Sequence, residues 1–401
     1  MSAPMAERAP VPAVSPVDGA RAAARALPGL SGVTPEELDA WVAARGAPAY
    51  RARQIEDWTW RHHATGAGAM ANVPAGLREE LASAYRLDTL AWTTVSVADG
   101  GLTRKALHGL HDGRLIESVL MRYPAGPGRR ERATACISSQ AGCAVGCPFC
   151  ATGELGFGRD LDRAEIVDQV RFWARVLGAE HRHLTNVVFM GMGEPLLNAD
   201  VVIEAIEALT DPRRFGLGAR HVTLSTSGVT PGIRRLTALR PQWTLAVSLH
   251  AARPGLRDVL VPLNRRYPVA EVVDAAGEYA AVSGRRVSYE YVMIDAINDT
   301  VADARAVVAL LRARLAHVNL IAMNPVAHTP WRPSAPARIA AFAEVLRSAG
   351  IPVTVRRNRG DEIGAACGQL AAERAGQPAP EAVRRRRERL ERAGAAVLRV
   401  P

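Results

Sequence analysis

Three of the five cysteines lie within eight residues, in the segment Cys143-Ala-Val-Gly-Cys147-Pro-Phe-Cys150. Three thiolates on one short loop can ligate three irons of a 4Fe–4S cluster, which leaves the fourth iron open to a small chelating molecule. A structural zinc site instead has four closed ligands, usually as two separated pairs, and the sequence has no second pair. Accidental core cysteines are the third alternative. The ligand count and spacing favour the iron–sulfur cluster.

Other candidate residues are single, and each alone has an ordinary structural explanation. Cys367 lies beside a glycine in a loop-like segment, where a lone cysteine is commonly an inert buried group. His250 ends an apolar segment and alone is more often structural. Glu117 lies in a strand-like segment, where a glutamate is normally exposed and idle. Gly193 and Glu194 fit an ordinary turn after a strand as well as they fit a ligand loop.

From about residue 134 the sequence alternates strand-like and helix-like segments that could position these groups. The strand candidates are Ala133–Ser138, Asn186–Met192, His221–Ser227, Trp243–His250, Val287–Ile294, Val318–Asn324 and Val353–Arg357. The helix candidates are Asp162–Leu177, Asp200–Leu209, Val269–Val282, Val301–Leu315 and Pro336–Ala349. Repeated βα units with apolar strands predict a parallel sheet with helices outside it. About six units suit a complete or partial barrel, whose chemistry lies at the C-terminal ends of the strands.

The remaining chain divides into four regions. Residues 31–92 predict short helices, one beginning at Thr34-Pro35-Glu36-Glu37, where threonine caps and proline occupies the first turn. Residues 93–133 predict a β extension with turns at Asp99-Gly100-Gly101 and His111-Asp112-Gly113. Residues 1–30 predict a disordered tail and residues 373–401 a basic tail. Residues 134–372 are then left for the barrel and its C-terminal loop.

Composition excludes several classes of protein. The 401 residues are 48% hydrophobic and 22% charged, as in globular proteins. No apolar stretch approaches the roughly 18 residues of a membrane helix, so we expect a soluble, unexported, cytoplasmic protein with no membrane partner. The net charge of +10 favours a polyanionic partner. Five cysteines are too few for a disulfide scaffold.

Several distinct motifs follow one another along about two-thirds of the chain. They are Cys136-Ile-Ser-Ser-Gln-Ala-Gly-Cys143, Gly191-Met-Gly-Glu-Pro-Leu-Leu-Asn198, Leu224-Ser-Thr-Ser-Gly228, Ser248-Leu-His250, Tyr289-Glu-Tyr-Val-Met293, Asn319-Leu-Ile-Ala-Met-Asn-Pro325 and Arg359-Gly-Asp-Glu-Ile-Gly-Ala-Ala-Cys-Gly-Gln-Leu370. Together they resemble the radical S-adenosylmethionine (SAM) enzymes, and specifically the RlmN-type RNA adenine carbon-2 methyltransferases. The cysteine spacing alone marks only the superfamily. Its combination with Gly-Met-Gly-Glu-Pro and Ala-Ala-Cys-Gly-Gln-Leu marks the RlmN group and its carbon-8 relative.

The resemblance implies an α/β fold, a partial (β/α)6 radical SAM barrel with a small N-terminal helical RNA-binding domain. It implies that Cys143, Cys147 and Cys150 ligate a 4Fe–4S cluster and that SAM chelates the open iron. The residues that match the family's SAM contacts are Gly193, Glu194, Ser225, Ser248, Leu249, His250 and Asn324.

The resemblance also implies three catalytic residues. Carbon 2 of adenine is electron-poor and does not attack a methylsulfonium, so a radical route replaces ordinary methyl transfer. Cys367 matches the methyl carrier, which is methylated by one SAM and then loses a hydrogen to a radical made from a second SAM. Glu117 matches the base that removes the ring proton from the RNA–Cys367 adduct. Cys136 matches the thiol that resolves this adduct through a disulfide with Cys367.

The implied substrates are 23S ribosomal RNA, at an adenosine in the peptidyl-transferase region, and transfer RNA, at the adenosine beside the anticodon. The target base must be flipped into the barrel mouth. Basic residues that could follow the phosphate backbone are Arg51, Arg53, Arg61, His62, His63, Arg129, Arg130, Arg132 and Arg356–Arg359. We also expect a flavodoxin-like electron donor and a monomer.

Two positions depart from the family pattern. The connector Ala125–Glu131, between Glu117 and Cys136, is longer than usual, and Gly364 stands where relatives often carry an acidic residue. The alternatives to the carbon-2 enzyme are the carbon-8 methyltransferase of drug resistance, a radical SAM enzyme that activates another protein through a glycyl radical, and a zinc RNA-binding protein. The segment that begins at Thr354 resembles the carbon-2 group better.

Overall fold

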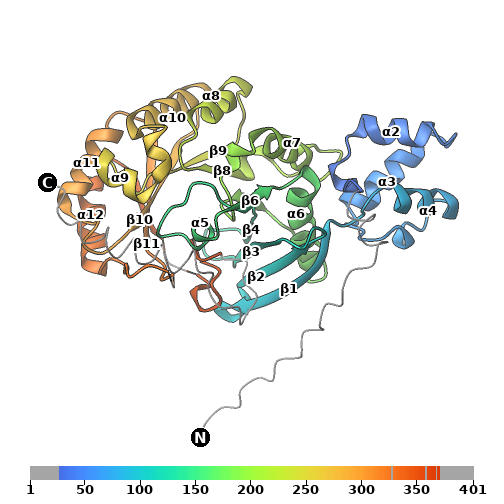
Figure 1. Ribbon diagram of the computed structural model, residues 1–401, viewed down its shortest axis with the longest axis horizontal. Coiled ribbons are helices and arrows are strands. Elements are labelled where there is room, and N and C mark those ends of the chain that lie inside the picture. Colours follow the sequence, from blue (N-terminus) through green and yellow to red (C-terminus); the bar gives the residue numbers. More distant parts are fainter. Residues whose placement is uncertain (1–26, 327, 357–358, 367, 371–401) are drawn as a thin grey trace, which may run out of the picture.

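The computed structural model describes residues 27–326, 328–356, 359–366 and 368–370 (Figure 1). Its centre is a ten-stranded sheet in the order β1-β2-β3-β4-β7-β8-β9-β10-β11-β12, and β5 and β6 form a separate pair. The strands are β1 Leu90–Ala98, β2 Thr103–Leu110, β3 Leu115–Tyr123, β4 Arg132–Cys136, β5 Gln140–Gly142, β6 Phe157–Asp160, β7 Asn186–Phe189, β8 Val222–Thr226, β9 Thr244–Ser248, β10 Val287–Met293, β11 Ala316–Ala322 and β12 Val353–Arg356.

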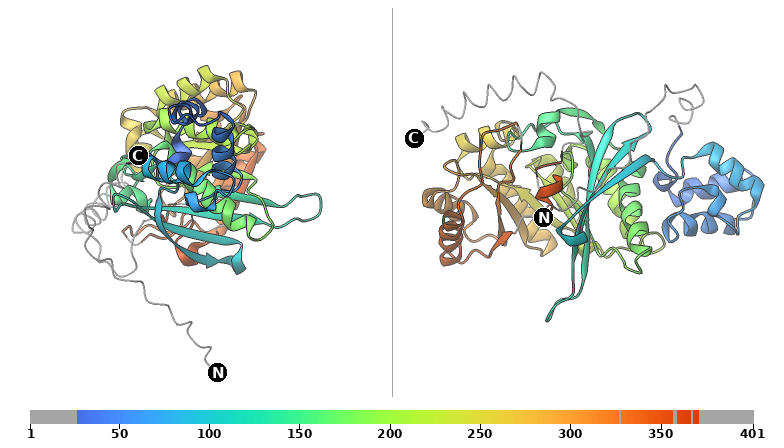
Figure 2. Two further views of the ribbon diagram at one scale, coloured as in Figure 1. Left: turned by 90° about the vertical axis from the view of Figure 1, so that its right-hand side faces the viewer. Right: turned by 90° about the horizontal axis from the view of Figure 1, so that it is seen from below.

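The sheet changes direction at β4. From β4 to β12 each neighbouring pair of strands is parallel, whereas β1, β2, β3 and β4 pair antiparallel. The parallel part curves, with helices along its outer face (Figures 1 and 2). The strands that sequence patterning predicts from residue 133 onward are all present, with ends that differ by at most three residues. The predicted α/β partial barrel is therefore confirmed.

Most barrel helices also agree with the prediction. The helices are α2 Pro35–Ala43, α3 Tyr50–Trp60, α4 Ala75–Ala84, α5 Ala151–Leu155, α6 Arg163–Gly178, α7 Ala199–Thr210, α8 Thr230–Leu239, α9 Pro254–Leu260, α10 Val269–Ser283, α11 Val301–Leu311 and α12 Pro336–Ser348. The predicted helix Val301–Leu315 is too long, because Arg312 has ψ 135° and Ala313 has φ 61°. Helices α8 and α9 were not predicted, although each has proline in its first turn.

Helices α2, α3 and α4 surround their own apolar core at one side of the barrel (Figure 2). Helix α2 begins at the predicted cap, where Thr34 Oγ1 accepts from Glu37 N at 3.1 Å. Two expected boundaries shift. Leu30 is buried within this core, so the last residues of the expected tail 1–30 are structured, and residues 1–26 lie outside the described part. The expected helical region 31–92 ends earlier, since β1 begins at Leu90.

The helical part is joined to the barrel through two buried residues of α6. Asp168 accepts hydrogen bonds from Ser31 Oγ at 2.7 Å and from Thr89 N at 2.8 Å. Arg171 pairs with Asp168 and donates to the carbonyl oxygens of Thr59, Leu87 and Ala64. These bonds satisfy both charged groups away from water. Within the described residues, no helix is long and apolar enough to cross a membrane.

Candidate active site

The three clustered cysteines lie on one loop that runs from β5 to α5. Gly142 ends β5 with φ 84°, and a Cβ there would lie 1.9 Å from the carbonyl oxygen of Gly156. Cys143 N donates to that same oxygen at 2.9 Å. Gly153, within α5, is also closely packed, since a Cβ there would lie 2.9 Å from Cys147 N. Both glycines are therefore needed for the loop to fold against the start of α5.

The three cysteines of this loop are half-buried. They pack against an apolar cluster that includes Val145, Phe149, Leu256, Leu260 and Met323. Burial raises the pKa of the Cys143 thiol to about 12 and that of Cys147 well above its ordinary value, because the apolar surroundings disfavour thiolate.

The donor set fits an iron–sulfur cluster. Three thiols from one loop are the ligands such clusters use, and positively charged iron would offset the cost of the buried thiolates. Among the described residues, no three His, Cys, Asp or Glu side chains are close enough to bind a single metal ion.

Glu194 is buried after β7 and anchors the loop to the next strand. Its Oε1 accepts from Leu196 N at 3.1 Å, and its Oε2 accepts from Ser227 N at 2.6 Å and from the Ser227 hydroxyl. Burial raises the pKa of Glu194, and the bonds from Ser227 act against that rise. Gly193 has φ 103°, and a Cβ there would lie 2.6 Å from the Gln140 side chain. A residue with a Cβ would therefore collide with Gln140, so this position requires glycine.

Ser225, Ser248 and Leu249 lie at the C-terminal ends of β8 and β9, as the barrel predicts. The parallel register pairs Ser225 with Ala246 and Ser248 with Glu290, so these ends lie along one edge of the sheet. The sequence analysis missed Arg257, which is fully buried in α9 beneath this edge.

Arg257 holds three backbone oxygens of the strand ends. It donates to Ser227 O at 2.7 Å, to Leu249 O at 3.0 Å and to Ser248 O at 3.1 Å. It also donates to the side chain of Asn264 at 2.9 Å. One side chain thereby fixes the positions of two neighbouring loops. The only sequence signal is an arginine that follows a proline-initiated turn.

His250 packs against the cysteine loop. Its ring packs edge-on against Phe149, with 4.8 Å between ring centroids, and its Nδ1 accepts from Val292 N at 3.1 Å. Burial lowers the pKa of His250 to about 3, so the ring is neutral at physiological pH. Asn298, which the sequence analysis also missed, donates to the His250 carbonyl at 2.8 Å. These contacts give His250 a structural role, and its contact with SAM remains a prediction.

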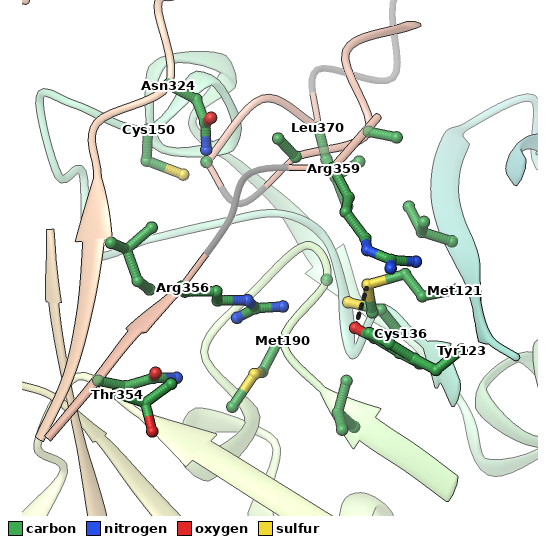
Figure 3. Close-up of a pocket in the computed structure, with 18 of the residues that line it drawn as sticks. Met121, Tyr123, Cys136, Cys150, Met190, Asn324, Thr354, Arg356, Arg359 and Leu370 are labelled. Carbon is green, nitrogen blue, oxygen red and sulfur yellow. Dashed lines mark hydrogen bonds between the residues drawn. The ribbon is translucent and has the colours of Figure 1, made fainter. Parts of the chain in front are cut away.

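A cavity of about 670 Å³ opens at this edge of the sheet (Figure 3). Cys136, Cys150 and Asn324 line it together, although they come from β4, from the cysteine loop and from the segment after β11. Cys136 ends β4 as predicted, where it pairs with Val119 on β3 and with Val188 on β7. The fold thus brings one of the two predicted reactive thiols into the same cavity as a predicted cluster ligand.

The segment after β12 closes one side of this cavity. Ala151 N donates to Gly368 O at 2.7 Å, and Thr152 Oγ1 donates to Leu370 O at 2.6 Å. Ala366 and Gly368 both line the cavity. Two residues that follow position 367 are therefore hydrogen-bonded to the start of α5, directly after the cysteine loop. Cys367 itself lies outside the described residues.

Glu117 is on β3, two residues before Val119, which lines the cavity. It is only 2% exposed, so it is not the solvent-exposed residue that a strand glutamate normally is, and its role as the base stays a prediction. Lys105 on β2 places its Nζ 2.8 Å from Glu117 Oε1. Glu117 is not among the described residues that line the cavity. The long connector 125–131 leaves the pairing of β3 with β4 intact, with Tyr123 opposite Arg132.

Comparisons with known proteins agree with this architecture. The family model of the radical SAM superfamily matches residues 137–311, and that of the ribosomal RNA large subunit methyltransferase N-terminal domain matches residues 29–87. The crystal structure of a radical SAM methyltransferase from Sphaerobacter thermophilus is 46% identical, has a TM-score of 0.83, and covers 86% of this chain and 100% of its own. Fold and site together define a radical SAM methyltransferase, and this class uses SAM and a 4Fe–4S cluster.

Two curated relatives narrow the family. The probable dual-specificity RNA methyltransferase RlmN of Parafrankia sp. (strain EAN1pec) is 49% identical over 358 residues, 86% of this chain and 91% of the relative. The protein of the same name from Moorella thermoacetica (strain ATCC 39073 / JCM 9320) is 46% identical over 347 residues, 85% of this chain and 96% of the relative. The chain belongs to the RlmN family of RNA methyltransferases.

Proposed function

We propose that this chain methylates carbon 2 of adenosine in 23S ribosomal RNA, in the peptidyl-transferase region, and in transfer RNA beside the anticodon. The observation that carries the proposal is the hydrogen bond from Ala151 N, at the start of α5 directly after the cysteine loop, to Gly368 O at 2.7 Å. The proposed chemistry needs the cysteine loop and the segment around position 367 to be close together, and this contact supports that requirement. Cys136 lines the same cavity and supplies the second thiol.

Cys143, Cys147 and Cys150 would hold the cluster, which supplies the electron that cleaves SAM when both are bound. Gly193, Glu194, Ser225, Ser248, Leu249, His250 and Asn324 would surround the SAM. Two SAM molecules per turnover follow from the carrier chemistry, because one methylates Cys367 and the other is cleaved. The buried surroundings of the cysteine loop would exclude water from the site.

The chain's own residues would carry the remaining steps. The Cys367 thiolate accepts a methyl from SAM by displacement, as the sulfur–carbon bond of the sulfonium breaks. Once that carbon is joined to the adenine ring, Glu117 takes the proton from carbon 2. The Cys136 thiolate then attacks the Cys367 sulfur and breaks its bond to the transferred carbon. That carbon keeps the bonding electrons and takes up a proton, so that methylated RNA is released and Cys136 and Cys367 are left as a disulfide. Two electrons from a flavodoxin-like reductant restore both thiols.

The domain organisation follows from the same proposal. With the boundaries moved to the observed elements, residues 30–89 would bind RNA as a helical module, residues 90–131 would extend the sheet, and residues 132–372 would form the catalytic barrel. The predicted tails at residues 1–26 and 373–401 lie outside the described residues. The substrate class implies a cytoplasmic location, and we propose a monomer as the working form.

One anaerobic experiment tests the proposal. Protein reconstituted with iron and sulfide is incubated with SAM, a reductant and 23S ribosomal RNA or transfer RNA, and the nucleosides are analysed by mass spectrometry. We expect 2-methyladenosine with the wild type and none with Cys367→Ala. Cys136→Ala should accumulate RNA covalently attached to protein, because nothing resolves the adduct. An 8-methyl product, full activity of Cys367→Ala, or zinc without iron would each contradict the proposal.

A further inference from the structure

Two arginines that are distant in sequence lie on one tyrosine ring at the cavity wall. The guanidinium carbon of Arg132 is 4.1 Å from the centroid of the Tyr123 ring, and that of Arg359 is 4.4 Å from the same centroid. Tyr123 ends β3, Arg132 begins β4 opposite it, and Arg359 follows β12. Arg359 also donates to Arg122 O at 2.8 Å, which fixes the later segment to β3. Tertiary folding therefore builds this group.

The positive charge of this group is not neutralised within the described protein. Neither Arg132 nor Arg359 forms an ion pair with a described residue, whereas Arg122 and Arg104 nearby both pair with Glu180. The cavity wall carries Arg129, Arg132, Arg356 and Arg359, and its described lining contains no Asp or Glu. An aromatic face compensates part of the cost of bringing two guanidinium groups together. The remaining positive charge favours an anion from outside the chain.

The position of the group indicates which anion it meets. Figure 3 shows Arg359 directed toward the end of the cavity that holds Cys136, Met121 and Tyr123, while Cys150 and Asn324 lie at the other end. The group therefore lies beside Cys136, so the phosphates that flank an adenosine bound at this thiol would be within its reach. Arg132 is exposed and Tyr123 half-buried, so the group borders both cavity and solvent.

We infer that Arg132, Tyr123 and Arg359 form a binding site for an RNA backbone phosphate adjacent to the target adenosine. The planar guanidinium groups donate paired hydrogen bonds to phosphate oxygens, and the Tyr123 ring holds them in position. This inference rests on the proposed function, since it assumes an RNA substrate in the cavity. The inference assigns phosphate binding to one defined cluster, whereas the net charge of the chain does not indicate where a phosphate would bind.

The test is the salt dependence of RNA binding by the reconstituted, full-length protein. Dissociation constants for an anticodon stem-loop RNA are measured by fluorescence anisotropy between 0.05 and 0.3 M salt, as a range of roughly one decade in which counterion release is resolved. Each phosphate contact that is lost should reduce the slope of log K against log salt by roughly 0.7–0.9. At about 0.1 M salt this corresponds to affinity weakened by roughly 5- to 8-fold for Arg132→Gln and for Arg359→Gln.

Matched variants separate this role from general charge and from folding. Arg266 is exposed and lies 5.3 Å from the Tyr267 ring, but it does not line the cavity, so Arg266→Gln should leave the slope unchanged. Tyr123→Phe keeps the ring and should bind like the wild type, whereas Tyr123→Leu should weaken binding. Arg132→Lys keeps the charge without the planar group and should lie between the wild type and Arg132→Gln.

Three outcomes would overturn the inference. Unchanged slopes for both Arg132→Gln and Arg359→Gln would show that no phosphate is bound here. Weaker SAM binding with unchanged RNA binding would assign the group to the SAM carboxylate. A slope that falls equally with Arg266→Gln would show a diffuse charge effect. If the wild type methylates RNA, these outcomes reject the inference alone; if the wild type neither binds nor methylates RNA, the proposed function fails with it.

Discussion

Lys105 Nζ lies 2.8 Å from Glu117 Oε1, and this ion pair is almost fully shielded, with 17% and 3% of the two side chains exposed. The two residues are diagonal neighbours on β2 and β3, because Lys105 is paired with Val119. A Cβ on Gly364 would lie 3.4 Å from the same Nζ. Lys105 therefore lies close both to the proposed base and to Gly364, in the loop that precedes Cys367.

We expect Glu117→Gln to lower RNA methylation by about 10²- to 10⁴-fold, because the amide keeps the shape of the side chain but cannot accept the ring proton. Methylation of Cys367 should continue, since that displacement needs no base at Glu117. Isotope-labelled SAM followed into protein and RNA separately measures both steps. Equal loss of both labels would mean that Glu117 acts through folding instead.

Lys105→Met should destabilise the protein, because it leaves the Glu117 carboxylate buried without its cation, at a cost of about 3–5 kcal/mol. Lys105→Arg keeps a positive charge near Glu117 and should restore most of the loss. Denaturant unfolding followed by circular dichroism compares the three proteins. Stability equal to the wild type in Lys105→Met would show that water replaces the lysine at Glu117.

Gly142→Ala should prevent cluster assembly. The new Cβ would lie 1.9 Å from Gly156 O, at a φ of 84° that favours glycine, so the turn into the cysteine loop must move. Iron and sulfide per chain after anaerobic reconstitution should fall well below wild-type values. Gly76→Ala is the control, since a Cβ there meets nothing within 4 Å. Normal iron content in Gly142→Ala would contradict the role given to this turn.

Arg171→Met should destabilise the joint between the helical part and the barrel by about 3–5 kcal/mol, because Asp168 remains buried without its charged partner. Three carbonyl oxygens of the helical part also lose a donor. Limited proteolysis should then release fragments cut near Leu87. The exposed pair of Arg347 and Glu344 provides the control, and Arg347→Met should change stability by less than about 0.5 kcal/mol.

The barrel is largely predictable from the sequence for a physical reason. Strands covered on both faces are largely apolar, so the predicted Val287–Ile294 differs from β10 by one residue. Arg257 is not predictable in this way, because its carbonyl partners at Ser227 and Leu249 become neighbours only when the loops after β8 and β9 meet. A charged residue in a short helix is ordinarily expected to face water.

The proposed catalytic residues show the same division. Cys136 and Glu117 are recognisable from motifs, but the pairing of Glu117 with Lys105 depends on the register across the turn after β2, which sequence patterning leaves open. The stack of Arg132 and Arg359 on Tyr123 likewise joins segments that are distant in sequence. Arg359 also donates to the carbonyl oxygen of Arg122, which lies 237 residues earlier in the chain. Contacts of this kind follow from the closed fold and not from local propensity.

His108 should make stability depend on pH. Its ring is buried between Thr93 Oγ1, 2.8 Å from Nδ1, and Ser118 Oγ, 2.7 Å from Nε2, and Trp173 Nε1 donates to the same Ser118 oxygen at 2.8 Å. The Ser118 hydroxyl can therefore donate to Nε2 only while the ring is neutral. Burial lowers the pKa of His108 to about 3.

The direction of this pH dependence is set by the number of protons that the folded and unfolded chains bind. Between pH 6.5 and 3 the unfolded chain binds a proton at this position and the folded chain does not, so folding stability falls as pH falls below about 6.5. From pH 8 to pH 5 this histidine should remove about 2 kcal/mol. His108→Gln carries no such proton, so its stability relative to the wild type should improve by that amount over the same range. Denaturant unfolding at both pH values measures the difference, and a constant gap between the two proteins would show that His108 is charged in the folded state.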